Sequence, residues 1–428
     1  MLLKACNTTE PPPDGEKPTL KLKLEDVSCT EAWIELRTTN LKLPATLTLK
    51  QNDQPRETIN LNKADTILYL DSLLPNTTYI FHTTIQSSNQ SEVKSNEISV
   101  TTMDTTSHNF TFTSWTFGTI GSSTLYDVAI INENNIWAVG EIMIADTSQN
   151  GYTTYNAVHW DGSQWELLRI PHYDYPNTLV YEELQTIFAF SENDIWFCSY
   201  SNLVHYDGNT FSSKAQFMTS VNFNGQVMKM WGSDRNNIYC VGRNGAIYHY
   251  YGTGWRRIES GTELQFTDIY GATNTKTSEQ EILAVCTRNL PLDKGIYRIQ
   301  GNTAVEISSV PIQWELFALW FVPNRHYYVV GSGIYEKKSL ADSLWLNEPL
   351  DITRYGTSGI RGNSINDVFV SGAFGEFLHF NGVTWKSYIN ETGWFSGSYG
   401  AVAVKNNLVV TVGYEGAQAK IMVGKRTN

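Results

Sequence analysis

Short hydrophobic segments recur along most of this chain, each ending at or near glycine and many following a polar turn. Seven copies begin at Ile136, Ile195, Ile238, Ile282, Tyr327, Val368 and Val409. Their first residues lie 59, 43, 44, 45, 41 and 41 positions apart. Asn and Asp are frequent just before the copies, as in 132–135 and 191–194. Because these residues tolerate left-handed backbone, the polar segments predict hairpin turns between strands.

A second motif follows four of the copies. It contains a His, an aromatic residue and a turn ending in Gly, followed by another aromatic residue, at 159–165, 205–211, 249–255 and 379–385. One repeat is therefore strand, turn, strand, turn, strand, tight turn, strand. A period in the low forties with this content predicts a β-propeller, with one four-stranded sheet, or blade, per repeat.

The two ends of the repeat region complement each other. The last repeat ends at 421–423 without its fourth, Trp-bearing strand, whereas the segment 110–117 precedes the first repeat and contains Trp115. We expect this segment to complete the last sheet, which protects edges that would otherwise aggregate. The prediction is an all-β chain with a seven-bladed β-propeller over 110–428, closed by an N-terminal strand.

The repeat resembles a family of bacterial propellers. Its units read roughly Asn/Asp-Ile/Val-Trp-Ala-Val-Gly, then His-Tyr/Trp-Asp-Gly-x-x-Trp, as in 135–140 and 159–165. The resemblance covers about three quarters of the chain. It implies the fold but no function, because propellers include enzymes, ligand binders and scaffolds.

Residues 18–103 follow a different pattern. The segment 73–79, Leu-Leu-Pro-Asn-Thr-Thr-Tyr, is similar to the tyrosine corner of fibronectin type III domains. The resemblance implies a β-sandwich in which Tyr79 packs in the core and its hydroxyl reaches the backbone. It also implies a strand with a core Trp at 32–36, and strands at 20–24 and 97–102. We expect a spacer domain, joined to the propeller by a linker at 104–109.

Charge limits the classes of partner. The net charge is -12 and the pI is near 5.2, with no basic cluster beyond Lys425 and Arg426. Nucleic acid is therefore excluded as a partner. The sequence holds no stretch of about eighteen apolar residues, the length that a spanning helix needs.

The first residues suggest an anchor. Residues 1–17 resemble the remnant of a bacterial lipoprotein signal followed by a Pro-rich tether, with Ala5 before Cys6 as the residue to be acylated. Lys4 departs from that pattern, and the charged and apolar parts of a signal are missing. The prediction is an exported protein, lipid-anchored through Cys6 to the bacterial outer membrane or cell surface. The alternative is that Cys6 is an ordinary thiol in a disordered tail.

The repeated histidines are the first candidates for a metal site. His159, His205, His249 and His379 occupy one place in four different blades, and Arg298 takes that place in the fourth. Such positions lie a blade apart, so they cannot share one ion. We expect each His to bond the blade backbone or a turn carboxylate instead. We therefore predict no metal, no cofactor and no catalytic residue.

Candidate ligand-binding residues lie where the repeat is broken. The first repeat is longer than the others, and its surplus falls at 141–156 and 171–182, two segments expected on one face and in contact. Aromatic residues mixed with His and Asp suit a glycan or a peptide. The predicted binding residues on these and related loops are His172, Tyr173, Asp174, Tyr175, Tyr181, Phe223, Trp394 and Phe395. The alternative is that these loops pack on themselves.

Arg361 completes the predicted site. It takes the innermost-strand place held by Trp231 and Trp320 in other repeats, so its charge is expected to face the central channel. An anionic ligand or a buried carboxylate would pair with it there, and a structural salt bridge is the alternative.

These observations favour a non-catalytic, monomeric binding protein at the cell surface, which holds a glycan or protein on its loop face. A carbohydrate-active enzyme is the second hypothesis, because Asp174 and Glu182 or Glu183 form a possible carboxylate pair. A structural scaffold of a surface complex is the third. Motifs of nucleophilic, zinc-protease and phosphate-binding sites do not occur in the sequence.

Overall fold

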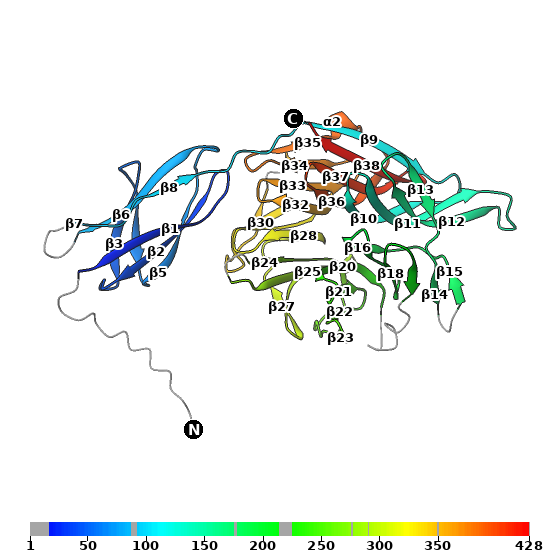
Figure 1. Cartoon of the computed structure of the whole chain (residues 1–428), viewed down its shortest axis with the longest axis horizontal. Helices are drawn as coiled ribbons and strands as arrows, with labels where there is room; N and C mark the ends of the chain where they lie inside the picture. Colours follow the sequence, from blue (N-terminus) through cyan, green and yellow to red (C-terminus); the bar gives the residue numbers. More distant parts are fainter. Residues whose placement is uncertain are drawn as a thin grey trace, which may run out of the picture. The chain divides into compact units, whose positions relative to one another are not determined.

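The computed structural model describes residues 17–86, 92–174, 178–213, 225–274, 277–289, 291–348 and 351–427. The chain divides into two compact units, Met1–Thr106 and Ser107–Asn428. Both are built from β-strands, as Figure 1 shows. Among the described residues, no helix is long and apolar enough to cross a membrane.

The first unit consists of two antiparallel sheets. One contains β1 (Thr19–Val27), β2 (Ala32–Thr39) and β5 (Asp65–Leu70). The other contains β3 (Ala45–Gln51), β4 (Gln54–Leu61), β6 (Thr78–Gln86) and β7 (Glu92–Lys94), with β8 (Ile98–Thr101) also paired to β6. Alternate residues of both sheets, such as Leu22, Ile34 and Phe81, form one buried cluster. This period of two is what sheets with one buried face require.

Two aromatic residues of this unit test the sequence expectations. Tyr79 is buried, and its hydroxyl accepts a hydrogen bond from the backbone N–H of Leu74 at 2.9 Å, as expected. Trp33 is also buried, at 5% exposed, but it does not belong to the same cluster as Tyr79. Ile34 contributes to the core cluster, so its neighbour Trp33 lies on the opposite face, where its ring packs 5.7 Å from that of Tyr69.

Seven four-stranded antiparallel sheets make up most of the described part of the second unit. We number them sheets 1 to 7 in chain order. Sheet 1 holds β10 (Thr124–Asn132), β11 (Asn135–Ala145), β12 (Tyr152–Trp160) and β13 (Trp165–Leu168). Sheet 2 holds β16 (Thr186–Ser191), β17 (Asp194–Ser199), β18 (Asn202–Tyr206) and β19 (Phe211–Ser213). Sheet 3 holds β20 (Val227–Asp234), β21 (Asn237–Gly242), β22 (Ile247–Tyr250) and β23 (Trp255–Arg257).

The other four sheets repeat this order. Sheet 4 holds β24 (Gln265–Thr273), β25 (Gln280–Asn289), β26 (Leu292–Gln300) and β27 (Thr303–Ile307). Sheet 5 holds β28 (Leu316–Val322), β29 (His326–Gly331), β30 (Gly333–Lys337) and β31 (Leu346–Asn347). Sheet 6 holds β32 (Thr357–Ser364), β33 (Asp367–Gly372), β34 (Phe377–Phe380) and β35 (Trp385–Ser387). Sheet 7 holds β36 (Gly397–Lys405), β37 (Leu408–Glu415), β38 (Gln418–Arg426) and β9 (Phe110–Phe117).

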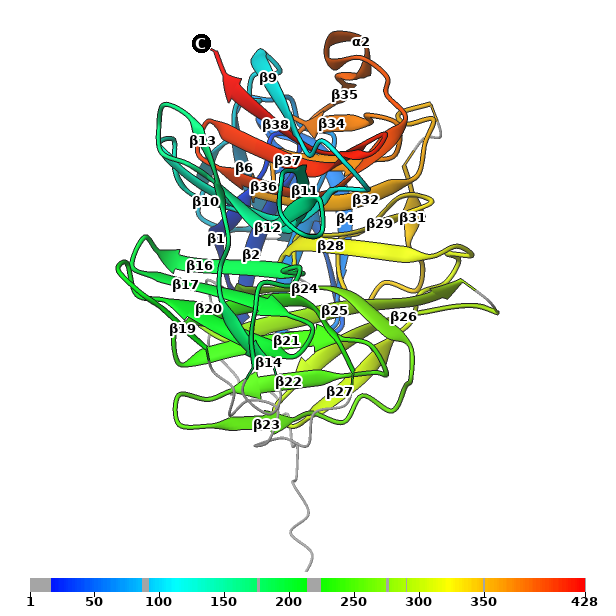
Figure 2. The same ribbon diagram turned by 90° about the vertical axis from the view of Figure 1, so that its right-hand side faces the viewer.

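Strand β9 completes sheet 7, as the sequence predicts. It pairs with β38 in antiparallel register, from Phe110 opposite Arg426 to Phe117 opposite Ala419. Figure 2 shows the two strands side by side, β9 in cyan and β38 in red. The first strand of each sheet packs against the first strand of the next, and β36 packs against β10. The seven first strands therefore form a closed cycle.

The recurrent hydrophobic phrase is the second strand of each sheet. Every residue of β17, β29 and β33 is buried, because neighbouring sheets cover both faces. This explains why the phrase is continuously apolar rather than alternating. Its terminal Gly has a steric cause. A Cβ at Gly140, Gly242 or Gly413 would overlap a backbone carbonyl oxygen in the adjacent first strand or just before it.

The repeated histidines bond to the residue that opens the second strand. The Nε2 atoms of His159, His205, His249 and His379 lie 2.6–3.1 Å from side-chain oxygens of Asn135, Asp194, Asn237 and Asp367, respectively. Each ring also packs on the aromatic residue of the phrase. The expectation of a structural hydrogen bond is therefore confirmed, with a turn Asn or Asp as the partner.

Two sheets keep this contact with other residues. In sheet 4 the His is replaced by Arg298, which lies 3.9 Å from Glu281, the residue in the Asn/Asp place. In sheet 5 the roles are exchanged, because His326 opens the strand and its Nδ1 lies 3.5 Å from Glu336. A polar pair at this position is therefore shared by six of the seven described sheets.

These buried histidines predict a loss of stability in acid. Burial lowers the pKa of His249 to about 4, and Arg256 adds to this. The unfolded chain, with a His pKa near 6.5, therefore binds protons first between about pH 6.5 and pH 4. The contribution of the neutral His249 to the free energy of unfolding is fully present above about pH 6.5. It decreases as the pH falls from about 6.5 to about 4. We expect His249 to account for about 2–3 kcal/mol of this loss.

Chemical denaturation at pH 7.5 and pH 4.5 measures this effect. The His249→Gln variant should lose less free energy of unfolding than the wild type between the two pH values. Glu348 acts in the opposite sense, because burial and Glu336 raise its pKa to about 7. The difference between the two proteins therefore isolates His249. An equal loss in both would contradict the assignment.

Regular structure occurs in the two insertions of the first repeat and in the segment that contains Trp394 and Phe395. The 141–156 segment is mostly an extension of the β11–β12 hairpin, with Ala145 opposite Tyr152. The 171–182 segment contains a hairpin of β14 (His172–Asp174) and β15 (Thr178–Val180). The 390–397 segment begins within a short helix, α2 (Ile389–Thr392). Backbone hydrogen bonds within a hairpin make long insertions rigid enough to form a binding surface.

Candidate functional site

A groove of about 810 Å³ lies in the described part of the second unit. One side comes from the β11–β12 hairpin and the other from the segment that follows β15. We call it the hairpin groove. Its lining residues are Glu141, Ser148, Asn150, Tyr152, Thr153, Thr154, Arg169, Val180, Tyr181, Glu182, Glu183 and Tyr200. The two insertions of the first repeat thus line one concavity.

Buried polar contacts fix the two walls of the hairpin groove. Asn156 is fully buried, and its Nδ2 donates to the carbonyl oxygens of Ile170 and Glu182, both at 2.9 Å. Its Oδ1 accepts from the N–H of Ile170 at 2.7 Å. Arg169 donates from Nε to the carbonyl of Thr154 at 3.1 Å, and its guanidinium lies 4.1 Å from the centre of the Tyr181 ring. The groove is therefore preformed.

Glu183 organises the polar floor of the groove. Its carboxylate accepts from the hydroxyl of Tyr126 at 3.1 Å and from Nε2 of Gln185 at 2.8 Å. A hydrogen bond to Glu183, followed by burial, raises the pKa of Tyr200. Burial, followed by the charge of Glu183, raises the pKa of Glu141. The carboxylate of Glu183 therefore contributes to both pKa shifts.

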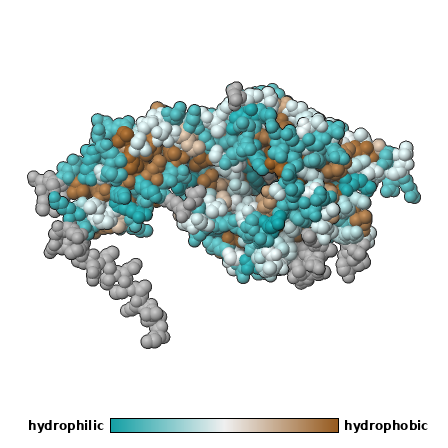
Figure 3. Space-filling model, in the orientation of Figure 1, coloured by the Kyte–Doolittle hydropathy of each residue, from teal (hydrophilic) through white to brown (hydrophobic). Residues whose placement is uncertain are grey.

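The groove therefore has an acidic and aromatic lining. Its lining contains three carboxyl groups and one cationic side chain, Arg169. The guanidinium of Arg169 already contacts the ring of Tyr181. Around them, Tyr152 and Tyr200 are 37% and 43% exposed. The face of this unit drawn in Figure 3 is mostly hydrophilic, with hydrophobic atoms in small groups. This lining suits a ligand that carries positive charge and an apolar surface.

A second, smaller cavity of about 160 Å³ lies among the first strands of the sheets. Arg361 lines it, as expected, and donates two hydrogen bonds to Asp268, from NH2 to Oδ1 at 2.7 Å and from NH1 to Oδ2 at 2.8 Å. Burial acts to lower the pKa of Arg361, but the charge and hydrogen bonds of Asp268 leave it raised. Lys229 and Asp127 form a second ion pair at 2.5 Å.

These two carboxylates also join neighbouring sheets. Asp127 accepts from the backbone N–H of Ile187 at 3.1 Å, and Asp268 accepts from that of Leu319 at 3.0 Å. Each aspartate thus bonds one cation and the first strand of the next sheet. The oxygens of Asp268 are committed to internal donors, so Arg361 acts as a structural brace here rather than as a free anion receptor.

Of the predicted residues on the 171–182 segment, Tyr181 lines the hairpin groove. Tyr173 is 42% exposed, and its backbone N–H lies 3.5 Å from Oγ of Ser213 beside sheet 2. His172 is fully buried, with Nε2 3.8 Å from Glu182, so it supports the groove wall from inside. Asp174 is placed by its backbone at the end of β14.

Other predicted residues fall elsewhere or outside the described chain. Trp394 is 58% exposed and stacks on Phe374 at 5.7 Å, outside the lining of the hairpin groove. Phe395 differs from the expectation, because it is buried against Tyr399 and lies under the ammonium of Lys420. Tyr175, Phe223 and Cys6 lie outside the described residues.

Several residues of both cavities escaped the sequence prediction. Glu141, Tyr152 and Tyr200 carry no motif, and only the folded hairpin brings them together. A repeat alignment of the first strands would have found the central charges. Asp127, Lys229 and Asp268 occupy one register position, opposite Val139, Val241 and Val285.

No protein-family model matches this chain, and no curated protein matches it. Solved structures do match. A structure of YCF48 bound to D1 peptide has a TM-score of 0.52 at 15% identity, covering 74% of this chain and 97% of that one. YCF48 from Cyanidioschyzon merolae has a TM-score of 0.50 at 12% identity, covering 73% and 98%. The WD40 β-propeller domain of Doa1 has a TM-score of 0.51 at 11% identity, covering 74% and 97%.

At such identities the likeness concerns the fold alone. The chain is similar to β-propeller proteins over about three quarters of its length, the share that the repeats occupy. The all-β and β-propeller predictions are therefore confirmed. The function has to be argued from the site itself.

Proposed function

We propose that this chain is a non-catalytic binding protein whose hairpin groove holds an extended segment of another protein, with a Lys or Arg side chain among the carboxylates. The observation that carries the proposal is the lining of the groove, where Glu141, Glu182 and Glu183 lie among exposed tyrosines. Carboxylates attract and orient a cation, and tyrosine rings give contact area at low entropic cost.

Two observations favour a peptide over a glycan. A neutral glycan has no positive charge to balance the three carboxyl groups when they are desolvated. One similar propeller structure also contains a bound peptide. The peptide bound to that protein supports a peptide as the class of ligand proposed here. The carboxylates of the hairpin groove indicate that the ligand is positively charged.

Fluorescence anisotropy with labelled peptides tests the proposal. A library of eight-residue peptides with one central Lys or Arg should bind the full chain more tightly than matched peptides with Gln. We expect Glu182→Gln and Tyr181→Ala each to weaken binding about tenfold, and salt to weaken it further. Both side chains are partly exposed, so the fold is retained.

Trp394→Ala serves as the matched control, because Trp394 is exposed and lies outside the groove. Its affinity should equal that of the wild type. If Trp394→Ala abolishes binding while the groove variants do not, the site is elsewhere. Binding to a glycan array that depends on Tyr181 would keep the groove and overturn the peptide assignment.

A carbohydrate-active enzyme is the second candidate. One observation favours it: the pKa of Glu141 is raised by burial and by Glu183, and glycosidases use carboxyl pairs with divergent pKa values. The carboxyl pair proposed here is Glu141 with Glu183, whereas the sequence suggested Asp174 with Glu182 or Glu183. Turnover of a chromogenic glycoside that is lost in Glu141→Gln would support this function over binding alone.

The proposal also includes the number of propeller blades, the type of the first domain, and the location of the protein. Seven four-stranded sheets and the pairing of β9 with β38 support a seven-bladed propeller. The sheet orders of the first unit and the Tyr79–Leu74 hydrogen bond support a fibronectin type III spacer. The residues around Cys6 support export and a lipid anchor on a bacterial surface. A scaffold role in a surface complex would use the same groove for its partner.

A further inference from the structure

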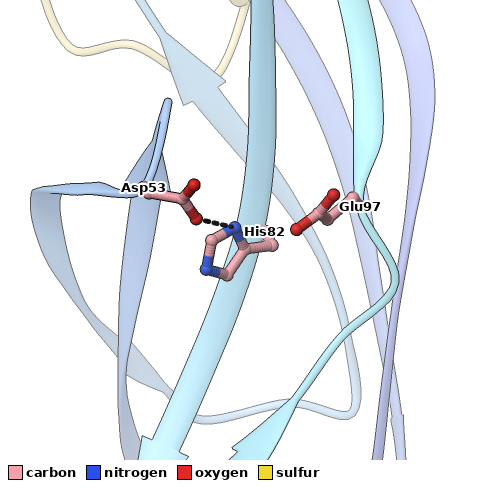
Figure 4. Close-up of side chains that lie close together, drawn as sticks. All are labelled: Asp53, His82 and Glu97. Atoms are coloured by element: carbon pink, nitrogen blue, oxygen red, sulfur yellow. Dashed lines mark ion pairs between the residues drawn. The ribbon is translucent and has the colours of Figure 1, made fainter.

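Three side chains that could bind a metal ion lie close together in the first unit. Asp53 lies in the turn between β3 and β4, His82 lies in β6, and Glu97 lies between β7 and β8. One nitrogen or oxygen of each side chain lies within 4.8 Å of the others. Figure 4 shows the two carboxylates on either side of the imidazole.

The imidazole of His82 lacks a hydrogen bond on the side that faces this cluster. The residue is only 2% exposed, and its Nδ1 has no hydrogen-bond partner among the described residues. The carboxylate oxygen of Asp53 lies 3.8 Å away, too far for a hydrogen bond. A buried polar atom without a partner costs about 1–3 kcal/mol, so such an atom indicates a missing ligand.

The spacing leaves room for one ion. Zinc lies about 2.0–2.2 Å from nitrogen and carboxylate ligands, so two ligands of one ion lie roughly 3.4 Å apart in tetrahedral geometry. The Asp53–His82 distance of 3.8 Å is close to this value. The carboxylates of Asp53 and Glu97 are 80% and 54% exposed, so small rotations bring their oxygens closer.

The backbone that carries the ligands is held in place. Asn52, next to Asp53, exchanges hydrogen bonds with Ile80 two residues before His82, through its side-chain oxygen at 2.9 Å and its N–H at 2.8 Å. Ser95, two residues before Glu97, bonds Thr83 through its hydroxyl oxygen and its N–H, both at 2.9 Å. The three ligands therefore start from fixed positions.

One lysine competes with a cation for a proposed ligand, and a second lysine pairs with an acidic residue of β7. Lys94 donates to Glu97 at 2.7 Å, and Lys50 lies 3.6 Å from Glu92. The neutral imidazole is the form that binds a metal, and His82 presents its Nδ1 to the two carboxylates. The lysine must leave Glu97 when the ion binds, so binding is weaker than the ligand set alone would allow.

We propose that Asp53, His82 and Glu97 form a binding site for a divalent transition-metal ion of the zinc type. One imidazole and two carboxylates suit zinc, whereas Ca²⁺ and Mg²⁺ prefer oxygen ligands alone. Three protein ligands leave at least one coordination position for water. The site is independent of the groove proposed for ligand binding.

Isothermal titration of the full, tag-free chain with ZnCl₂ after chelator dialysis tests the site. The double variant Asp53→Asn, Glu97→Gln should lose one binding event or weaken it at least about tenfold. Both residues are exposed, so the fold should survive, and circular dichroism checks this. Lys94→Gln should tighten binding several-fold, because it removes the competing charge.

The double variant Glu57→Gln, Asp65→Asn is the control with the same loss of charge, since both side chains are exposed and lie away from the cluster. It should bind zinc like the wild type. Equal zinc binding by the Asp53 and Glu97 variant would overturn the site and assign the ion to other histidines. Binding of Ca²⁺ or Mg²⁺ as tight as that of Zn²⁺ would overturn the assignment to a transition metal.

Discussion

Replacing Gly242 by Ala should destabilise the second unit by about 3 kcal/mol and lower its melting temperature by roughly 4–5 °C. Gly242 ends the hydrophobic phrase of sheet 3, and a Cβ there would overlap the carbonyl oxygen of Gln226. That carbonyl also accepts from the N–H of Arg243 at 2.9 Å. Relief of the overlap must therefore move backbone, which is costly in a packed sheet. Differential scanning calorimetry measures the change.

Gly400→Ala is the matched control, because a Cβ at Gly400 meets no atom within 4 Å. It should change the melting temperature by less than about 2 °C. If Gly242→Ala proves as mild as Gly400→Ala, steric exclusion is not the reason for the repeated glycine. The same experiment at Gly413 should reproduce the large effect, because its Cβ would overlap the carbonyl of Ser398.

Replacing Asp268 by Asn should destabilise the second unit by about 3–5 kcal/mol. The change leaves the shape of the side chain but removes the charge that balances Arg361, whose side chain is 18% exposed. An uncompensated guanidinium among the first strands is far more costly than the loss of one hydrogen bond. Urea denaturation at pH 7.5 gives the free energy of unfolding.

A double variant separates charge burial from shape. Asp268→Asn with Arg361→Met should recover most of the lost stability, because no uncompensated charge remains and Asn still accepts from the N–H of Leu319. Glu133→Gln is the surface control, since its pair with Lys425 is about 60% exposed on both sides. Its effect should stay below about 0.5 kcal/mol. A loss of that size for Asp268→Asn would show that the central pair is solvated.

The candidate sites were less predictable than the fold. The surplus length of the first repeat located the walls of the hairpin groove, because insertions in a repeat project from a shared face. The residues that matter within it were not predictable. Glu141, Tyr152 and Tyr200 come from two different sheets and meet through the register of the extended β11–β12 hairpin. Trp394 and Phe395 were predicted together on one loop, but Trp394 is exposed and Phe395 is buried.

Periodicity along the chain determined the sheets and how they close. A continuous apolar phrase with Gly at its end needs cover on both faces, and the Trp-bearing segment 110–117 matches the strand that the last repeat lacks. These signals are local and recur at nearly regular intervals along the sequence. The His and Asn/Asp pair of four repeats is also local, because two neighbouring strands bring the same positions together in each of them.

Only the tertiary structure decided which charges meet. Arg361 and Asp268 lie 93 positions apart in sheets 6 and 4, and the ring brings them into contact across its centre. Asp53, His82 and Glu97 likewise come from three separate strands or turns without a recognisable spacing. Pairing between distant segments depends on sheet register and on the path of the chain, and no local propensity encodes either.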